Sequence, residues 1–491
     1  MPEILEKSTG AFELCGPFVD ETINVSPGIK DKLIRAGAYA VTNFVLRTAD
    51  AEQRRLLAKY LGRPARTLDQ WRQKLLAEYP DLNSLQPCEL GPLVFGEECF
   101  AGPLPAPEET EYIHKFKEGV GNYNWARAGR PTLDLRQRMH KPVTQGGKGI
   151  CWACTATATA EGTHPKFSAD TGEKASEKFV IQVTKADIGD PWPNKEGGSA
   201  ALAAKAICKR GLVSEEDYPT NPATINFRVR PPADIYREAA KNKFASSLDA
   251  GDTFNGSWDA IAAILNGVKG FRGRPLTLSI PLYSSFRTVG SNGIVPDPLP
   301  GESIIGYHAM TIVGMVYLKV GTVSLPYLIV RNSWGENWGY NGYCFISMSY
   351  FKKHSRRIAM LFTQVEACDQ MFSNALVFLT AVYAKLQRKS VHMLAALVLL
   401  FVCIAGFFSV LDAGDVTEEP PLIATPQIGG DCPVCPPPEE PQQNAQLERM
   451  DHPPRYSHAA FMEFSEGYDL NQQRLFRLLE ELLQTKRNSK P

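Results

Sequence analysis

Apolar residues recur at helical spacing through the first part of the chain. Between about residues 25 and 85 they return every three or four positions, with polar or charged residues between them. This period is typical of amphipathic helices, which bury one stripe against their neighbours. It predicts a small all-α module over residues 25–85, preceded by an N-terminal tail over residues 1–24. The pattern is carried by Ile29, Leu33, Ile34, Val41, Phe44, Val45, Leu56, Leu57, Tyr60, Leu61, Leu68, Trp71, Leu75 and Leu76.

The order of features in this module loosely resembles a helix-hairpin-helix-related bacterial module. An Ala-Gly turn, an apolar helix, the run Arg54–Gly62 and a helix centred on Trp71 follow one another. A small helical bundle for protein contacts is at least as well supported as nucleic-acid binding, because basic residues alternate with acidic ones. The whole chain carries 53 basic and 53 acidic residues. No nucleic-acid partner is expected from this balance.

A second apolar pattern lies near the C-terminus. Residues 393–411 form 19 consecutive positions without a charge, close to the ~20 needed to cross a bilayer. A buried core helix is the alternative, but such helices rarely run so far without a polar residue. Basic residues precede the segment and acidic residues follow it, so the positive-inside rule predicts a cytoplasmic N-terminal side. The flanking charges are Lys385, Arg388 and Lys389, then Asp412, Asp415, Glu418 and Glu419.

Four further segments are assigned from composition. Residues 86–130 are rich in Pro, Gly and Glu and are predicted to be a linker that packs partly on the domain after it. A connecting segment, 366–392, leads to the transmembrane helix. Residues 412–458 are Pro-rich with few large apolar residues and are predicted to be disordered. The tail, 459–491, contains an amphipathic helix about four turns long, whose marginal length suggests a protein partner or self-association.

Cysteine content and the chain start add two expectations. Eleven cysteines in 491 residues do not form a disulfide scaffold, and no pair of them has a second pair nearby at zinc-ligand spacing. No metal and no cofactor are therefore expected. The first residues do not show a basic start followed by an apolar run, so no secretory signal peptide is expected.

Four polar residues between these patterns have the types needed for thiol catalysis. Gln145 lies six residues before Cys151, which opens an alanine-rich apolar run. His308 lies in an apolar strand pattern, and Asn332 follows 24 residues later. A thiol attacking a carbonyl needs a base, a group that orients the base, and a donor for the oxyanion. These four residues supply all three.

At this point the chain resembles a papain-like cysteine protease over residues 131–365. The motifs that carry the resemblance come in the family's order, and the 157 residues from nucleophile to histidine slightly exceed the roughly 130–150 expected. The resemblance implies an α+β fold of two lobes, one helical and led by Cys151, the other β-rich and carrying His308 and Asn332. The motifs are Leu133–Arg136, Gln145–Ala153, Gly197-Gly198, Glu215–Pro219, Asn332–Gly335, Trp338-Gly339 and Gly342-Tyr343.

The resemblance also implies roles for individual residues. His308 would form an ion pair with Cys151, helped by the positive end of the helix dipole. Gln145 would donate to the oxyanion. The glycine pair Gly197 and Gly198 would border the substrate cleft, and Trp334 would shield the hydrogen bond between His308 and Asn332. A peptide or protein substrate follows from these roles.

Two departures from the family pattern matter. The cysteines of a family disulfide are replaced by Lys148 and Lys195, which fits a reducing compartment and agrees with the cytoplasmic orientation. Cys154 replaces a usual aromatic residue and creates a C-x-x-C with Cys151. A thioredoxin-like enzyme would not need the glutamine, histidine or asparagine, so that alternative is disfavoured. Cys154 is either a resolving thiol that silences Cys151 on oxidation or simply a small buried residue.

These observations predict a membrane-anchored cysteine peptidase. Two alternatives remain: acyl transfer to a nucleophile other than water, and a catalytically weak scaffold whose helical ends recruit partners. The helical signature of the family's inhibitory propeptide is not recognisable upstream of the predicted protease domain. The sequence therefore leaves open whether residues 1–130 restrain the site.

Overall fold

The computed structural model describes residues 4–6, 12–14, 16–88, 110–190, 196–268, 270–320, 323–355 and 358–363. They belong to the first of two compact units, Met1–Phe372. The predicted connecting segment 366–392, transmembrane helix 393–411, linker 412–458 and tail 459–491 lie outside the described residues. Among the helices that the structure describes, none is both long enough and apolar enough to cross a membrane.

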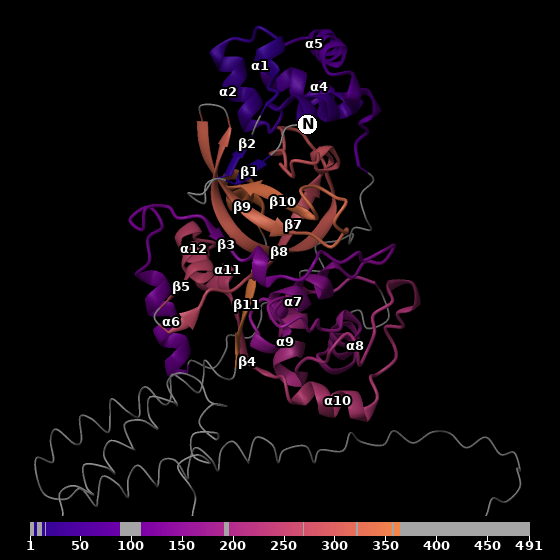
Figure 1. Ribbon diagram of the computed structural model, residues 1–491, viewed down its shortest axis with the longest axis vertical. Helices are drawn as coiled ribbons and strands as arrows, with labels where there is room; N and C mark the ends of the chain where they lie inside the picture. Colours follow the sequence, from indigo (N-terminus) through magenta and orange to yellow (C-terminus); the bar gives the residue numbers. More distant parts are fainter. Residues whose placement is uncertain are drawn as a thin grey trace, which may run out of the picture. The chain divides into compact units, whose positions relative to one another are not determined.

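A mostly antiparallel sheet forms the centre of this unit (Figure 1). Its long strand β8 (Ile304–Val320) pairs with β7 (Leu276–Tyr283) and with β9 (Val323–Arg331), and β9 pairs with β10 (Tyr343–Ser347). Residues 306–316 of β8 are all buried, because side chains on both faces of the strand meet other elements. This explains why the sequence shows a continuous apolar run here and no alternation. His308 lies in this buried stretch.

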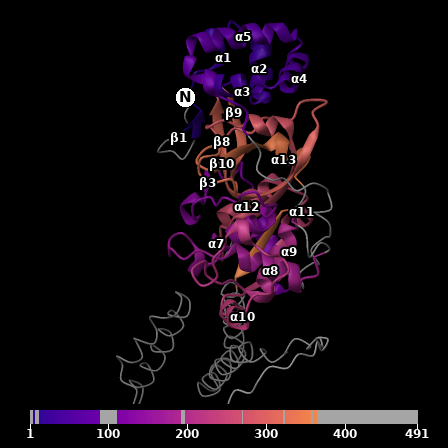
Figure 2. The same ribbon diagram turned by 90° about the vertical axis from the view of Figure 1, so that its right-hand side faces the viewer.

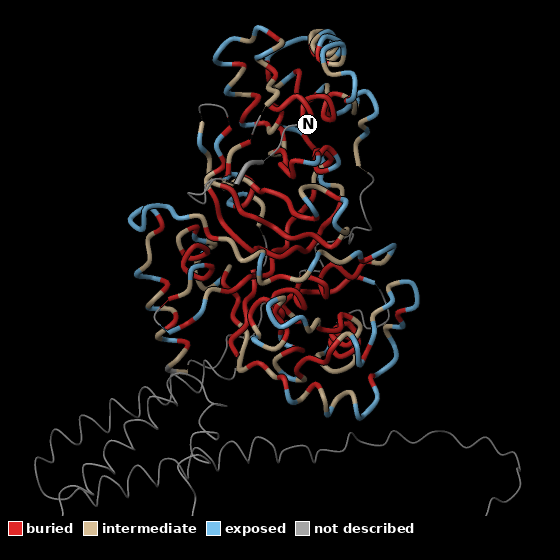
Figure 3. Tube along the Cα trace, viewed as in Figure 1, coloured by how far each residue is buried: buried red, intermediate tan, exposed pale blue. Residues whose placement is uncertain are grey.

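The helical lobe packs against β8 through its first helix, and burial is continuous across this contact (Figure 3). Every residue of that helix is buried, and its Ala and Thr side chains are small enough for close approach to the strand. Ser176 and Ser199 cap the next two helices by accepting backbone N–H bonds. The helices of this lobe are α7 (Cys151–Glu161), α8 (Glu177–Asp187), α9 (Ala200–Arg210) and α10 (Ala233–Ala240).

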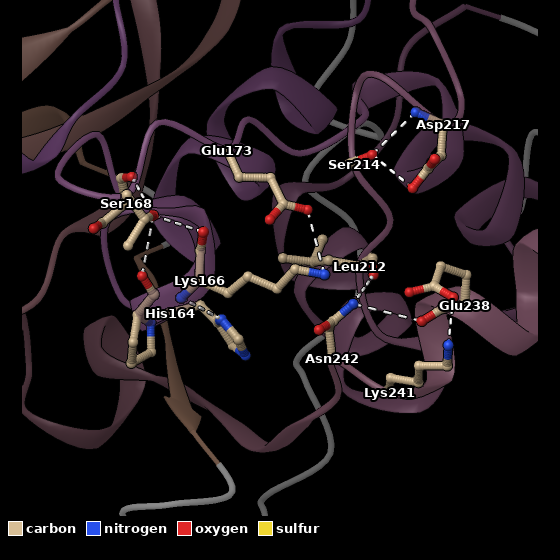
Figure 4. Close-up of polar contacts among 12 residues, drawn as sticks. His164, Lys166, Ser168, Glu173, Leu212, Ser214, Asp217, Glu238, Lys241 and Asn242 are labelled. Atoms are coloured by element: carbon tan, nitrogen blue, oxygen red, sulfur yellow. Dashed lines mark hydrogen bonds and ion pairs between the residues drawn. The ribbon is translucent and has the colours of Figure 1, made fainter. Parts of the chain in front are cut away.

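Polar contacts of side chains hold loops of the helical lobe together (Figure 4). Nδ1 of His164 accepts a hydrogen bond from the backbone N–H of Lys166 at 3.2 Å. The Lys166 ammonium lies 3.3 Å from the Glu173 carboxylate. Nδ2 of Asn242 donates to the Leu212 carbonyl at 2.9 Å. Burial, together with the Lys166 charge, lowers the pKa of His164 to about 4, which keeps Nδ1 an acceptor at neutral pH.

The remaining elements complete the unit. Strand β4 pairs with β11 in a separate two-stranded sheet, and β5 pairs with β6 in another. Strand β3 pairs with β8. The bounds are β3 (Leu133–Asp134), β4 (Phe244–Asp249), β5 (Gly267–Val268), β6 (Phe271–Arg272), β11 (Ala359–Thr363), α11 (Ala250–Thr253), α12 (Trp258–Asn266), α13 (Met348–His354), and short 3-10 helices at Pro80–Ser84, Arg136–Arg138, Pro165–Phe167, Pro222–Thr224 and Ser284–Thr288.

Part of the segment predicted as a linker, 86–130, is a helix. Helix α6 (Glu111–Gly121) buries Ile113, Phe116 and Val120, which share one face at helical spacing. The ring of Phe116 lies edge-on to Phe362, with centroids 5.0 Å apart. The helix itself was not predicted, because Pro and Gly nearby obscure its short apolar period, but its packing against the protease domain agrees with a linker that packs partly on that domain.

The N-terminal region forms helices that pack on the β-rich lobe (Figure 2). Aliphatic residues of these helices share one apolar core with residues on the outer side of β8, β9 and β10. Asp50 caps α4 through the Gln53 N–H, and Gly62 ends it in a left-handed conformation. The helices are α1 (Val19–Thr22), α2 (Pro27–Arg35), α3 (Val41–Ala49), α4 (Ala51–Leu61) and α5 (Ala65–Glu78).

Two short segments of the predicted N-terminal tail, 1–24, are strands of the sheet. Strand β2 (Phe12–Leu14) pairs in parallel with residues 318–320 of β8, and β1 (Ile4–Glu6) pairs with β2. Phe12 and Leu14 are buried on the same side. The term tail is wrong for these residues, because the end of β8 offers them unpaired backbone groups and an apolar surface.

A buried polar network joins the helical module to the β-rich lobe. The Arg47 guanidinium donates to Oε1 of Gln53 at 3.0 Å and lies 3.5 Å from the Glu302 carboxylate, and both charged side chains are fully buried. Asn43 and Asn292 exchange side-chain amide bonds across the same interface. Burial lowers the pKa of Arg47 to about 10, and Glu302 opposes this shift. The carboxylate of Glu302 therefore helps the buried Arg47 guanidinium to remain charged inside the protein.

Candidate active site

His308 and Asn332 meet at the inner edge of the β-rich lobe. Nε2 of His308 lies 2.7 Å from Oδ1 of Asn332, which also accepts the Ser333 backbone N–H at 2.8 Å. An amide oxygen can only accept, so His308 must donate through Nε2. Its Nδ1 then carries the lone pair, and this buried atom has no hydrogen-bond partner among the residues the structure describes.

Aromatic rings cover this pair. The Trp334 indole lies over the His308 ring with centroids 4.8 Å apart. Trp338 meets Trp334 edge-on at 5.2 Å and stacks on Phe286 at 5.6 Å. Burial lowers the pKa of His308 to about 4, and the hydrogen bond with Asn332 partly opposes the shift. The resting imidazole is therefore neutral at pH 7 and able to accept a proton.

Cys151 is the first residue of α7 and is 1% exposed. Ile150, the residue before it, offers no side-chain cap, so the positive end of the helix dipole faces this region. One turn further on, Thr155 donates to the Met310 carbonyl at 2.6 Å. The C-terminal end of α7, at Gly162, lies beside Pro275. The next residue, Leu276 in β7, pairs with Ile312 of β8.

These two anchor points show that α7 and β8 run in the same direction. Cys151 lies one helical turn before Thr155, and His308 lies two residues before Met310. A helical turn and two strand residues rise by similar distances, about 5–7 Å. The packing thus brings the thiol and the imidazole to the same end of the interface between the lobes.

The side chain of Gln145 is held at both ends. Its Oε1 accepts from the Ser333 hydroxyl at 2.6 Å, and its Nε2 donates to the Lys148 carbonyl at 2.8 Å. The backbone N–H of Gln145 donates to the Ser333 carbonyl at 2.9 Å. Because Ser333 follows Asn332 directly, these bonds tie the glutamine to the same turn that orients the histidine.

The glycine pair lies beside the loop that leads into Cys151. Gly197 donates its N–H to the Gly149 carbonyl at 2.9 Å. A Cβ on Gly198 would lie 2.6 Å from the Trp152 ring, so only glycine fits there. The structure thus gathers Gln145, the glycine pair and α7 on one side of the site.

Cys154 lies one turn along α7 from Cys151 and is buried. Burial raises the pKa of its thiol well above the usual range, with the Glu177 charge adding to the shift. Cys151 and Cys154 are thiols in this structure, not a disulfide. The proposed redox switch stays a prediction.

Sequence reasoning missed several residues that position the site. Thr155 fixes α7 on β8, Ser333 holds Gln145, and Glu196 contacts the loop before Cys151. Only Glu196 left a sequence signal. It lies next to Lys195, one of the two positions where the family's disulfide is replaced.

Comparisons with known proteins agree with this geometry. A family model described as papain family cysteine protease matches residues 130–362. An uncharacterized peptidase C1-like protein of Acanthamoeba polyphaga mimivirus is 33% identical over 223 residues, which are 43% of this chain and 67% of the viral protein. Cysteine proteinase 1 of Zea mays is 25% identical over 221 residues, covering 43% of this chain and 54% of the maize protein.

Among solved structures, xylellain, a cysteine protease from Xylella fastidiosa, aligns with a TM-score of 0.40 at 19% identity. The alignment covers 56% of this chain and 99% of xylellain.

The fold and the family match define a thiol-dependent hydrolase that acts on peptides. The chain belongs to the papain family of cysteine proteases. The predicted papain-like domain and its α+β fold are confirmed. The chain spans 67% of the length of the viral protein and 54% of the length of the maize protein.

Proposed function

We propose that the protein is a membrane-anchored peptidase that cleaves peptide bonds through a covalent thioester on Cys151. His308 serves as base and then as acid, and Asn332 orients it. Gln145 and the backbone N–H of Cys151 donate to the oxyanion. Gly197 and Gly198 border the bound peptide, and Trp334 covers the histidine.

The reaction begins when the Cys151 thiol gives its proton to Nδ1 of His308. The sulfur bonds to the substrate's carbonyl carbon, and the carbonyl electrons move to the oxygen, which the Gln145 amide stabilises. Collapse restores the carbonyl, breaks the C–N bond and passes the proton from His308 to the leaving amine. Water, deprotonated by His308, then attacks the thioester and releases the acid and the thiol.

The observation that carries this proposal is the single tautomer of His308. Its Nε2–H is bonded to Asn332, and its buried Nδ1 is left as an acceptor without a partner among the described residues. Because burial keeps the imidazole neutral, an imidazolium forms only when a thiolate compensates its charge. The N-terminus of α7 favours that thiolate.

The test uses the full-length chain in detergent, a fluorogenic peptide library and an epoxide that alkylates thiols. We expect cleavage and labelling in the wild type and neither in Cys151→Ala. The matched control is Cys154→Ala, three residues along the same helix, which should retain both. Labelling without cleavage, with transfer of the acyl group to added amines, would instead identify an acyl transferase. A folded wild type that is neither labelled nor active would favour the scaffold.

Membrane attachment through residues 393–411 is a separate part of the proposal. It rests on the 19 uncharged residues and on the charges that flank them, which favour a cytoplasmic protease domain. We expect the chain to stay in the membrane fraction after alkaline extraction and a deletion of 393–411 to release it. A wild type that is extracted into the soluble fraction contradicts the anchor.

The tail, 459–491, is proposed to bind a protein partner or a second copy through its amphipathic helix. Circular dichroism and sedimentation of this peptide should show helix content that rises with concentration if it self-associates. Coil at all concentrations contradicts self-association.

A further inference from the structure

Glu196 bridges two groups of the loop that leads into Cys151. One carboxylate oxygen lies 3.0 Å from the Lys148 ammonium, and the other accepts the Gly149 backbone N–H at 2.8 Å. The two side chains are partly exposed, at 33% for Lys148 and 40% for Glu196. These contacts stand where the resemblance implies a disulfide in other family members.

The peptide unit between Lys148 and Gly149 links this carboxylate to the glutamine. Its N–H donates to Glu196, and its carbonyl accepts from Nε2 of Gln145 at 2.8 Å. Because a peptide unit is planar, a bond that fixes the direction of its N–H also fixes the direction of its carbonyl. Glu196 therefore holds the acceptor toward which the Gln145 amide points.

The same loop is tied to the glycine pair by bonds that do not involve the carboxylate. The Gly149 carbonyl accepts both the Gly197 N–H at 2.9 Å and the Trp152 indole N–H at 3.1 Å. Behind the pair, the Lys185 ammonium donates to the Gly197 carbonyl at 2.6 Å and pairs with Asp190 at 2.7 Å, both fully buried. Removing Glu196 thus leaves the framework of the loop in place.

We propose that Glu196 is a positioning residue for the oxyanion donor Gln145, acting through the Lys148–Gly149 peptide unit. This inference rests on the peptidase function proposed above. In this role Glu196 acts through the Gly149 N–H and takes no direct part in the reaction. It keeps the peptide unit from rotating, so that the glutamine amide is already oriented when the oxyanion forms. A preorganised donor is worth far more in the transition state than one that must first reorient.

The experiment compares three single variants of the full-length protein. Glu196→Ala removes the ion pair and the acceptor, Glu196→Gln keeps a neutral acceptor for the Gly149 N–H, and Lys148→Met removes the ion pair alone. We expect kcat/KM for a peptide to fall about 10–100-fold in Glu196→Ala, below the loss for a missing oxyanion donor. Glu196→Gln and Lys148→Met should stay within about 3-fold, because an exposed ion pair contributes little.

Two further measurements separate positioning from general damage. Iodoacetamide alkylates a thiolate without forming an oxyanion, so its rate at Cys151 should be unchanged in Glu196→Ala. In a Gln145→Ala background, Glu196→Ala should have no further effect on kcat/KM, because its only target is gone. A loss that persists in that background, or that slows alkylation equally, assigns Glu196 a structural role and overturns the proposal.

The outcomes also separate this proposal from the function on which it rests. An active wild type whose Glu196→Ala variant is equally active contradicts the role of Glu196 alone. A wild type that is alkylated at Cys151 but cleaves no peptide contradicts the peptidase function, and the role of Glu196 with it.

Discussion

The β-rich lobe has two buried faces, which differ in whether their buried polar groups have hydrogen-bond partners. At the face toward α7, Nδ1 of His308, Nδ2 of Asn332 and Nε1 of Trp334 are buried without hydrogen-bond partners among the described residues. At the face toward the N-terminal helices, Arg47, Gln53, Glu302 and the amide pair are bonded to one another. Hydroxyl groups of Thr42 and Ser285 are exceptions there.

This difference separates a site from a permanent interface. A buried polar atom without a partner costs about 1–3 kcal/mol, so a fold keeps such atoms where a later event completes them. Substrate and reaction can do so for His308 and its neighbours. At the face toward the N-terminal helices no substrate would complete an unpaired polar atom, and the buried charges there are paired with each other. The helical module is accordingly part of the folded β-rich lobe.

The largest effect should come from the face toward α7. His308→Gln should lower kcat/KM by about 10⁴-fold or more, because base and acid are lost together. The unfolding free energy should not fall, since a buried imidazole with an unpaired atom contributes little to it. Peptide hydrolysis and urea unfolding measured on the same preparation check both parts. A variant that loses stability as much as activity would remove the contrast between the faces.

The second effect belongs to the opposite face. Glu302→Ala should lower the unfolding free energy by about 3–5 kcal/mol, because it leaves the Arg47 charge buried without its partner. Glu302→Gln retains acceptors for the neighbouring N–H groups and should cost less. Activity per folded molecule, obtained by titrating active thiols, should be unchanged. A lower turnover per active thiol in the variant would show that changes at this face affect the active site.

A third change tests how the histidine is oriented. Asn332→Ala should lower kcat/KM by about 10²-fold, the low end of what a positioned base contributes. The imidazole would then populate both tautomers, so the loss should appear in kcat more than in KM. Nitrogen NMR of the imidazole can follow the tautomer directly. An unchanged single tautomer in the variant would count against this role.

The smallest effect concerns His164, which is partly buried in the helical lobe, whereas His308 is fully buried. The pKa of both is lowered to about 4 from an ordinary 6.5. The unfolded chain therefore binds protons first, and stability falls as pH drops from about 6.5 toward 4. His164→Asn keeps an acceptor for the Lys166 N–H. It should reduce the loss of unfolding free energy at low pH by on the order of 1 kcal/mol.

The check is urea unfolding at pH 7 and pH 4.5 for wild type and His164→Asn, which should differ mainly at the lower pH. Equal pH dependence in the two proteins would mean that His164 titrates normally in the folded state.

Much of the site could be predicted because its residues sit in local patterns. Gln145 and Cys151 lie within one short run, and Asn332 to Gly335 form another, so the spacing within each run was enough to predict them. The helices of residues 25–85 could be predicted from the helical spacing of their apolar residues. Strand β2 was not, because three residues are too few to show alternation and its partner lies about 300 residues away.

Charged partners were equally hidden from the sequence. The bond of Glu196 to Gly149 depends on which loops meet, and the neighbouring Lys195 marks the position of Glu196 without revealing its partner. Arg47 and Glu302 carry no local sign that they will be buried. Local period predicts which face of an element is apolar, but it does not say which distant charge will lie opposite.

The pairing of Arg47 with Glu302 also sets an order of events during synthesis. The two residues are 255 positions apart, so at about 5–20 residues per second the ribosome needs roughly 13–50 s to deliver the second after the first. Helices α2 to α5 can form in that interval, but their arginine has no carboxylate to meet. The module that is translated first can therefore complete its packing only after most of the protease has emerged.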